Sequence, residues 1–348
     1  MSRPPHQYID RASGQLRTER LYQDEVVMFF YDRVREQMPA VFTWLTSRQS
    51  TRLLGYLNYD QPWSAGRGRR FLEEQSVDLG ECLDDPHRFR TARDVFERKI
   101  RYWDCRPMSY EPYAIVSPAD ARALIGTFVE NATVYLKEKF FGYEELLGNR
   151  PAWLDAFHRG DYAIFRLTPE KYHYNHTPVA GRVLDVYEID GVYHSCNPGA
   201  AMSVAAPYSK NRRVVTVIDT DVPGGTQVGL VAMIEVVALM IGEIVQCYSE
   251  SRYDHPQDVV PGMFVERGCP KSLFRPGSST TVLVFEPGRV KFSPDLVANQ
   301  QHPQAQSRYT LDFARTLVET DVRVRSPVAY TRQRAPRRRR GQELIHVE

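Results

Sequence analysis

Residues 228 to 245 read VGLVAMIEVVALMIGEIV, which is the one long apolar run of this 348-residue chain. On length alone the run could span a bilayer as a helix. It contains Glu235 and Glu243, however, and two glutamates inside a span would cost several kcal/mol. The run is rich in β-branched residues and follows Pro223-Gly224-Gly225. We therefore interpret it as buried β structure in a protein that is soluble or at most peripheral to a membrane.

Short β-branched runs of the same kind continue on both sides of this stretch, after about residue 113. They occupy residues 162–167, 182–189, 192–195, 214–219 and 281–285. Asp190-Gly191 between two of them predicts a tight hairpin. Residues 21–47 differ, because apolar residues recur there every four positions from Val26 to Met38, which predicts a helix. The expected fold class is α+β, with a helical N-terminal region and a β-rich catalytic core.

Composition and charge set the expected domain limits. The chain is 42% hydrophobic and 25% charged, which is typical of a globular protein. We expect a disordered segment (1–20), the helical region (21–105), the core (106–295), an extension (296–330) and a basic tail (331–348). The tail holds the run Arg337 to Arg340, which we interpret as a solvated terminus and not as a nucleic-acid site.

Five widely spaced cysteines and a polar N-terminus indicate the expected compartment. The cysteines show no CxxC or zinc-ligand spacing, which favours reduced thiols and no structural metal. The first fifteen residues lack the apolar centre of a signal peptide. The sequence therefore predicts a cytoplasmic protein.

Three polar clusters could carry chemistry. Ser278-Ser279-Thr280-Thr281 lies directly before an apolar strand, His173 and His176 follow another strand, and Asp120 follows Ser117-Pro118. Each cluster alone has an ordinary structural explanation. Together they could form a set in which a carboxylate orients an imidazole and the imidazole activates a hydroxyl. On an extended segment His173 and His176 would face opposite sides, so we do not expect them to share a metal ion.

The order of these clusters resembles the phosphatidylserine decarboxylase family over about residues 106–292. The matching stretches are Arg106-Pro107, Ser117-Pro118-Ala119-Asp120, Glu145-Leu146-Leu147-Gly148, Phe165-Arg166-Leu167-Thr168-Pro169, Tyr172-His173-Tyr174-Asn175-His176-Thr177-Pro178 and Phe274-Arg275-Pro276-Gly277-Ser278-Ser279-Thr280. The family's processing serine precedes threonine and lies six residues before phenylalanine. Ser279 meets both conditions, through Thr280 and Phe285.

This resemblance implies a self-processing decarboxylase. Ser279, with His176 as base and Asp120 orienting it, would attack the carbonyl of Ser278 and break the chain there. Ser279 would become a pyruvoyl group, so neither pyridoxal phosphate nor a metal is expected. The pyruvoyl group would form a Schiff base with the substrate amine, and His176 would return a proton after carbon dioxide leaves. His173 is carried over as a residue for substrate contact or orientation.

The substrate is inferred from departures from the family pattern. Val237 and Glu243 replace a glycine and a serine that are usual in members acting on lipid, and residues 235–245 resemble the soluble branch that acts on free aromatic amino acids such as tryptophan. We therefore expect a free aromatic amino acid as substrate. The alternative is phosphatidylserine, with Phe29 and Phe30 as a small interfacial patch in peripheral contact with phospholipid.

Two further classes are weighed against the decarboxylase. They are an uncleaved serine hydrolase that uses the same three residues and a non-catalytic binding protein. We expect the two cleavage fragments to stay associated with each other. The sequence leaves open whether the protein forms a homo-oligomer.

Overall fold

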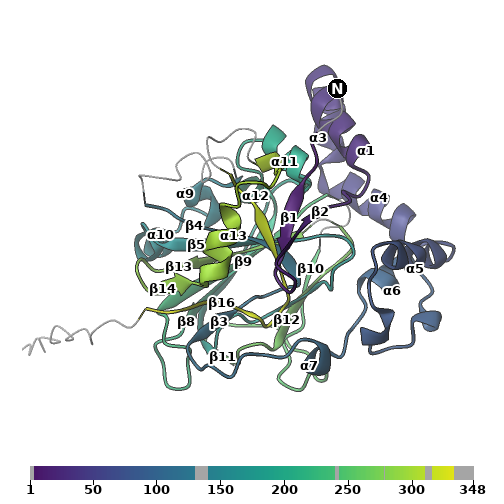
Figure 1. Cartoon of the computed structure of the whole chain (residues 1–348). Helices are drawn as coiled ribbons and strands as arrows, with labels where there is room; N and C mark the ends of the chain where they lie inside the picture. Colours follow the sequence, from purple (N-terminus) through teal and green to yellow (C-terminus); the bar gives the residue numbers. More distant parts are fainter. Residues whose placement is uncertain (1–3, 130–139, 240–242, 278, 310–315, 333–348) are drawn as a thin grey trace, which may run out of the picture.

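A ten-stranded mixed sheet forms the centre of the protein (Figure 1). The structure is a computed structural model that describes residues 4–129, 140–239, 243–277, 279–309 and 316–332. Across the sheet the strands are β11 (Phe264–Val265), β7 (Gly181–Ile189), β8 (Arg213–Asp219), β9 (Leu230–Val237), β13 (Ser279–Phe285), β5 (Asp161–Leu167), β4 (Ala121–Thr127), β15 (Glu319–Val322), β1 (Gln7–Asp10) and β2 (Gln15–Thr18). Neighbours run antiparallel, except that β1 is parallel to β15. The α+β fold class predicted from the sequence is confirmed.

The central strands are covered on both faces. In β13, Leu283 and Phe285 pack into one hydrophobic cluster, while Val282 and Val284 pack into a second cluster on the other face. Because both faces are buried, such strands show continuous apolar runs and no polar alternation. This explains the run at 228–245, which forms β9 and then β10 (Ile244–Gln246), with residues 240–242 outside the described part. None of the described helices is long and apolar enough to cross a membrane.

Two three-stranded sheets complete the core. One has the order β10, β12 (Pro270–Phe274), β6 (Tyr174–His176) and therefore joins the approach to the serine cluster to the histidine segment. The other has the order β14 (Val290–Phe292), β16 (Pro327–Thr331), β3 (Ala114–Val116). In the described part of the chain, five helices border the sheets: α9 (Tyr143–Leu146), α10 (Pro151–Phe157), α11 (Pro198–Ser203), α12 (Pro207–Lys210) and α13 (Pro294–Gln300).

The N-terminal helices lie along one side of this β-rich body (Figure 1). They are α1 (Asp24–Phe29), a π-helical turn η1 (Phe30–Val34), α2 (Arg35–Gln37), α3 (Pro39–Leu45), α4 (Arg48–Tyr59), α5 (Ser64–Glu74), the 3-10 turns η2 (Leu79–Glu81) and η3 (Pro86–Arg88), α6 (Ala92–Phe96) and α7 (Tyr102–Cys105). Tyr31 and Phe42 pack on Ala200 of α11, and the Tyr31 hydroxyl accepts a hydrogen bond from the Ser195 amide at 2.7 Å. A small aromatic contact thus fixes the helices to the core.

Three expectations need correction. Residues 1–20 are not disordered throughout, because β1 and β2 extend the large sheet. Asp190-Gly191 does not form a tight hairpin, because β7 pairs with β8, which begins only at Arg213. A Cβ on Gly191 would lie 2.3 Å from the Lys210 carbonyl oxygen, so this glycine permits a close backbone approach. Residues 296–330 supply β15 and β16, so this segment is part of the sheets and not an extension of them.

Candidate active site

Ser279 is the first residue of the central strand β13, where it pairs with Leu167 of β5 and Val237 of β9. The β-branched and aromatic residues that follow favour a strand held on both sides. Gly277 precedes it with φ of +150°, a conformation that side chains disfavour. Ser279 is 1% exposed, and its hydroxyl has no hydrogen-bond partner among the described residues. A buried, unpaired hydroxyl at a strand entrance is typical of a functional group. Ser278, the other half of the predicted cleavage site, lies outside the described residues.

Asp120 is held as an ionised carboxylate at the end of a buried turn. The Arg106 guanidinium binds both its oxygens at 2.8 to 3.1 Å, and the Val324 amide donates to it at 2.8 Å. Burial would raise the pKa of Asp120, but the attraction of Arg106 overcomes this and holds the pKa below its ordinary value. Arg106 also pairs with Glu81. Sequence reasoning placed Arg106 in a motif but did not find its role, and Glu81 carried no signal.

His176 is completely buried at the end of β6, and both of its ring nitrogens are hydrogen-bonded. Nδ1 lies 2.9 Å from the Gly268 carbonyl oxygen, and Nε2 lies 3.0 Å from the Tyr172 hydroxyl. A carbonyl can only accept, so the Gly268 contact places the ring proton on Nδ1 and leaves Nε2 as the basic atom. Burial lowers the pKa of His176 to about 3, which keeps the ring neutral.

His173 lies in the segment before β6 and differs from His176 in its surroundings. Its ring stacks on Phe96 of α6 at 3.6 Å between centroids, and Nε2 lies 3.4 Å from the Pro169 carbonyl oxygen. Nδ1 is buried without a partner among the described residues. Burial lowers the pKa of this imidazole to about 3 as well. Phe96 is a contact that the sequence did not predict, because α6 lies far from the histidines along the chain.

Asn175, between the two histidines, connects their segment to the serine strand. Its side-chain oxygen accepts a hydrogen bond from the Thr281 hydroxyl at 2.9 Å. Thr281 lies two residues after Ser279 on the same face of β13, and His173 lies two residues before Asn175. Asn175 therefore lies on the Thr281 side of β6, while the neighbouring His176 ring packs edge-on against Tyr102.

Among the described residues, no direct hydrogen bond joins the members of the predicted triad, Ser279, His176 and Asp120. The His176 amide donates to the Pro118 carbonyl at 2.7 Å, which fixes β6 against the turn that carries Asp120. The charge of Asp120 acts to raise the pKa of both histidines, although burial outweighs it. The oxygens of Asp120 remain engaged by Arg106 and Val324.

A fully buried ion pair lies beneath this junction. The Lys271 ammonium is 2.6 Å from Glu235 Oε2, and both side chains are at most 1% exposed. Ser272 and Asn175 donate to the other oxygen of Glu235. Glu235 in β9 faces Thr281 in the sheet register, so this network joins β9, β12, β6 and β13. A buried pair of this kind specifies one arrangement of the strands, because breaking it leaves an unpaired charge.

A pocket lined in part by Gly277 lies on the side of the N-terminal helices. Its lining includes Glu19, Tyr22, Arg166, Cys196 and Leu239. The pocket combines apolar walls with a few polar groups next to the cleavage position, which is how small-molecule sites are generally built.

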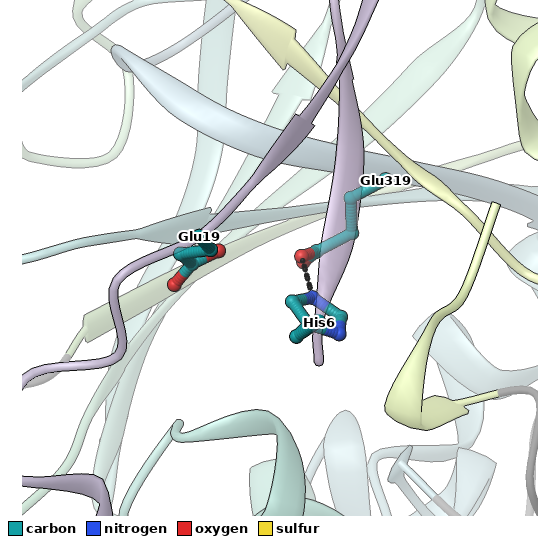
Figure 2. A group of neighbouring side chains, drawn as sticks. All are labelled: His6, Glu19 and Glu319. Atoms are coloured by element: carbon teal, nitrogen blue, oxygen red, sulfur yellow. Dashed lines mark hydrogen bonds and ion pairs between the residues drawn. The ribbon is translucent and has the colours of Figure 1, made fainter. Parts of the chain in front are cut away.

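His6, Glu19 and Glu319 form a group of potential metal ligands, and Glu19 also lines this pocket (Figure 2). His6 Nε2 lies 2.8 Å from Glu319 Oε2. The Arg166 guanidinium donates to Glu19 at 3.0 Å and to Glu319 at 2.9 Å. Because Arg166 already balances the two carboxylates, we interpret the group as an ion-pair network that fixes β1 to the core.

Comparison with known proteins gives one consistent family. The sequence model of the family described as phosphatidylserine decarboxylase matches residues 92–310. The chain is 26% identical to a phosphatidylserine decarboxylase proenzyme of Fusobacterium nucleatum over 303 residues, covering 85% of this chain and 92% of that protein. It is 30% identical to the proenzyme of Bordetella petrii, with coverage of 64% and 79%, and 29% identical to proenzyme 3 of Schizosaccharomyces pombe, with coverage of 84% and 29%.

These matches correct one expectation and settle another. A free aromatic amino acid as substrate is contradicted, because the relatives are named phosphatidylserine decarboxylases. The substrate prediction based on Val237 and Glu243, which depart from the family pattern, was therefore wrong. The resemblance inferred from separate motifs is confirmed, and the chain belongs to the phosphatidylserine decarboxylase family of pyruvoyl-dependent carboxy-lyases.

Proposed function

We propose that this protein is a phosphatidylserine decarboxylase, which matures by cleaving itself before Ser279 and then converts phosphatidylserine to phosphatidylethanolamine. The observation that supports phosphatidylserine as the substrate is the apolar surface of the N-terminal helices beside the pocket at Gly277. A substrate embedded in a bilayer must be reached by an enzyme that can rest on that bilayer, whereas a free amino acid needs no such surface.

In the cleavage step, the Ser279 hydroxyl attacks the Ser278 carbonyl carbon and the bond from that carbon to the Ser279 nitrogen breaks, which leaves an ester. Removal of the Ser279 α-proton then expels the Ser278 carboxylate. Water replaces the nitrogen, which leaves as ammonia, and Ser279 becomes a pyruvoyl group. The buried, unpaired hydroxyl of Ser279 and the positive φ of Gly277 support this position.

The proposed roles of the polar residues follow from their contacts. His176, from its place in the motif, is the base that accepts the Ser279 proton at Nε2, since Gly268 holds the ring proton on Nδ1. In the structure Nε2 bonds to the Tyr172 hydroxyl, so the transfer requires that this contact breaks. Asp120 acts through its charge and favours the imidazolium that then forms. His173, whose Nδ1 is buried without a partner among the described residues, serves substrate contact or orientation. Once formed, the pyruvoyl group supplies the electron sink for the carbon–carbon bond that breaks.

Exposed apolar side chains are concentrated in the N-terminal helices. Most of the large hydrophobic side chains that are exposed among the described residues lie between Tyr22 and Trp63: Tyr22, Val26, Phe29, Met38, Val41, Trp44, Leu53, Tyr56, Leu57 and Trp63. Trp63 is 73% exposed and Phe29 is 57% exposed. Exposed apolar surface on this scale marks an interaction site. Tyr22 also lines the pocket that reaches Gly277, so this region adjoins the proposed site.

The test combines mass with a substrate comparison. An intact mass under denaturing conditions should give two fragments that divide between Ser278 and Ser279, the smaller with a pyruvoyl end. The cleaved protein should release carbon dioxide from phosphatidylserine vesicles and form phosphatidylethanolamine, with little release from free tryptophan or serine. A single uncut chain with esterase activity would favour the hydrolase, and a cleaved chain active only on a free amino acid would overturn the proposed substrate.

A further inference from the structure

A second pocket, here called the helix pocket, lies among the N-terminal helices. Its walls come from α4, α5 and α6, and they are mostly aromatic or aliphatic: Tyr59, Phe71, Leu72, Val95 and Phe96. Leu72, Val95 and Phe96 are at most 5% exposed, so packing holds these walls in place. Gly68 lets α5 approach α6 closely, because a Cβ at this glycine would lie 3.3 Å from Val95. The helix pocket is therefore a formed apolar site.

The helix pocket adjoins the pocket beside the cleavage position. The two share Tyr22, Tyr59 and Pro169 as lining residues. The Pro169 carbonyl oxygen lies 3.4 Å from His173 Nε2, and Phe96, a wall of the helix pocket, stacks on the same imidazole. One end of the helix pocket thus lies next to the candidate active site.

On its other side the helix pocket adjoins the exposed apolar surface of α4. Asn58 and Tyr59 line the pocket. Tyr56 and Leu57, which directly precede them in the helix, are 56% and 53% exposed. The pocket therefore lies between the surface proposed to rest on a bilayer and the position where the chain is cleaved.

The charge of the helix pocket suits an anionic lipid. Among the described residues that line it, Arg67 is the one with a charged side chain. Its guanidinium is exposed and donates to the Asn58 carbonyl at 2.7 Å. A phosphodiester joins the serine headgroup of phosphatidylserine to its acyl chains, and arginine is well suited to bind phosphate oxygens. Apolar walls with one cation and no acidic residue match this combination of an acyl chain and a negative charge.

Resting on the proposed function, we propose that the helix pocket holds one acyl chain of phosphatidylserine while the serine headgroup lies in the pocket beside the cleavage position. The phosphodiester then lies on the side of Arg67. The protein recognises the lipid as a single molecule, in addition to resting on the bilayer. Each methylene group that leaves water for such a pocket favours binding about fourfold.

Two water-soluble compounds test the acyl site without a membrane. One is phosphatidylserine with two hexanoyl chains, kept below the concentration at which it forms micelles, and the other is glycerophosphoserine, which has no acyl chain. Binding to the uncut Ser279→Ala chain is measured by titration calorimetry. It should be about a hundredfold tighter for the dihexanoyl lipid, because the methylene groups of one chain become buried. Carbon dioxide release by the cleaved wild type should show the same preference in kcat/KM.

A label added after folding then fills the helix pocket. In the Ser279→Ala chain, Asn58→Cys is modified with a hexyl methanethiosulfonate, which attaches an alkyl chain through a mixed disulfide. The labelled chain should bind both compounds with equal affinity, and dithiothreitol should restore the preference. Glu73→Cys, an exposed position of α5 outside the pocket, is the matched control and should keep the preference when labelled. The chain without an added cysteine, treated in the same way, controls for the five native cysteines.

The outcomes separate the acyl site from the proposed reaction. Equal affinity of the unlabelled chain for the two compounds would overturn the acyl site, even if the wild type decarboxylates phosphatidylserine in vesicles. A preference that survives the label at Asn58, or that the label at Glu73 removes equally, would overturn it as well. A preference that the label at Asn58 alone removes, in a protein whose wild type cleaves but releases no carbon dioxide from phosphatidylserine, would support the acyl site and overturn the proposed reaction.

Discussion

The β core and the N-terminal helices use their apolar residues in opposite ways. In β13, Val282, Leu283, Val284 and Phe285 are completely buried between two clusters. In α1 to α5, side chains of similar size, such as Phe29, Trp44 and Trp63, are more than half exposed. The core strands are thus covered by other described residues, whereas the helical region exposes apolar side chains that the described residues leave uncovered. This difference is what the proposed function requires, with the chemistry in one region and the contact with a lipid surface in the other.

Within the β core, removal of the Ser279 hydroxyl should have the largest effect on cleavage and activity. Ser279→Ala should leave the chain uncut and inactive, because no nucleophile remains at the start of β13 and no pyruvoyl group can form. Intact mass and carbon dioxide release measure both effects. Ser278→Ala is the control and should still be cleaved. Cleavage in Ser279→Ala together with its loss in Ser278→Ala would move the nucleophile by one residue.

Breaking the buried ion pair between Lys271 and Glu235 tests how much the stability of the β core depends on it. Lys271→Met should lower the free energy of unfolding by about 3 to 5 kcal/mol, because Glu235 is left buried without its partner. The double variant Lys271→Met with Glu235→Leu should recover most of that loss. Urea unfolding of both proteins measures the difference. A single variant as stable as the wild type would show that Glu235 finds another partner or is neutral.

Acid should weaken the core. His173 and His176 have pKa values lowered to about 3 by burial, whereas in the unfolded chain they titrate near 6.5. Between these values the unfolded state binds more protons, so the free energy of unfolding must fall as pH falls from 6.5 toward 3. The slope is up to about 1.4 kcal/mol per pH unit for each histidine. Below 4.5, Glu319 adds to the loss, because Arg166 overcomes burial and lowers its pKa to about 2.

Unfolding by urea at several pH values measures this slope. His176→Gln should reduce the slope, because one lowered pKa is removed. An unchanged slope in His176→Gln would mean that this imidazole is protonated in the folded protein.

The smallest effect on stability is expected on the helical surface. Phe29→Ser and Trp63→Ser should change the free energy of unfolding by no more than about 0.5 kcal/mol. Each should weaken binding to phosphatidylserine vesicles about tenfold, since an inserted large apolar side chain contributes about 1.5 to 3 kcal/mol. Vesicle co-sedimentation measures binding, and Leu184→Ser on the β core, 39% exposed, is the control. Equal binding by all three variants would remove the surface from the proposed function.

The sequence by itself determined the fold class, the family and the residues that carry the motifs. The run at 228–245 predicts buried β structure because two glutamates exclude a membrane span, and β9 confirms this reading. Ser279, His176 and Asp120 come from motifs in which residue type and spacing are local. Such information survives in a sequence because it depends on neighbours along the chain.

Tertiary structure alone decided the contacts between distant segments. Asp190-Gly191 has the local pattern of a hairpin, but packing against the Lys210 and Asn211 backbone places that glycine elsewhere. The pairing of Asp120 with Arg106, the stacking of Phe96 on His173 and the approach of Tyr253 to Tyr172 join residues that share no periodicity. A buried charge or imidazole is satisfied by whichever group the fold brings within hydrogen-bond distance. The identity of that group therefore becomes visible only when the chain is folded.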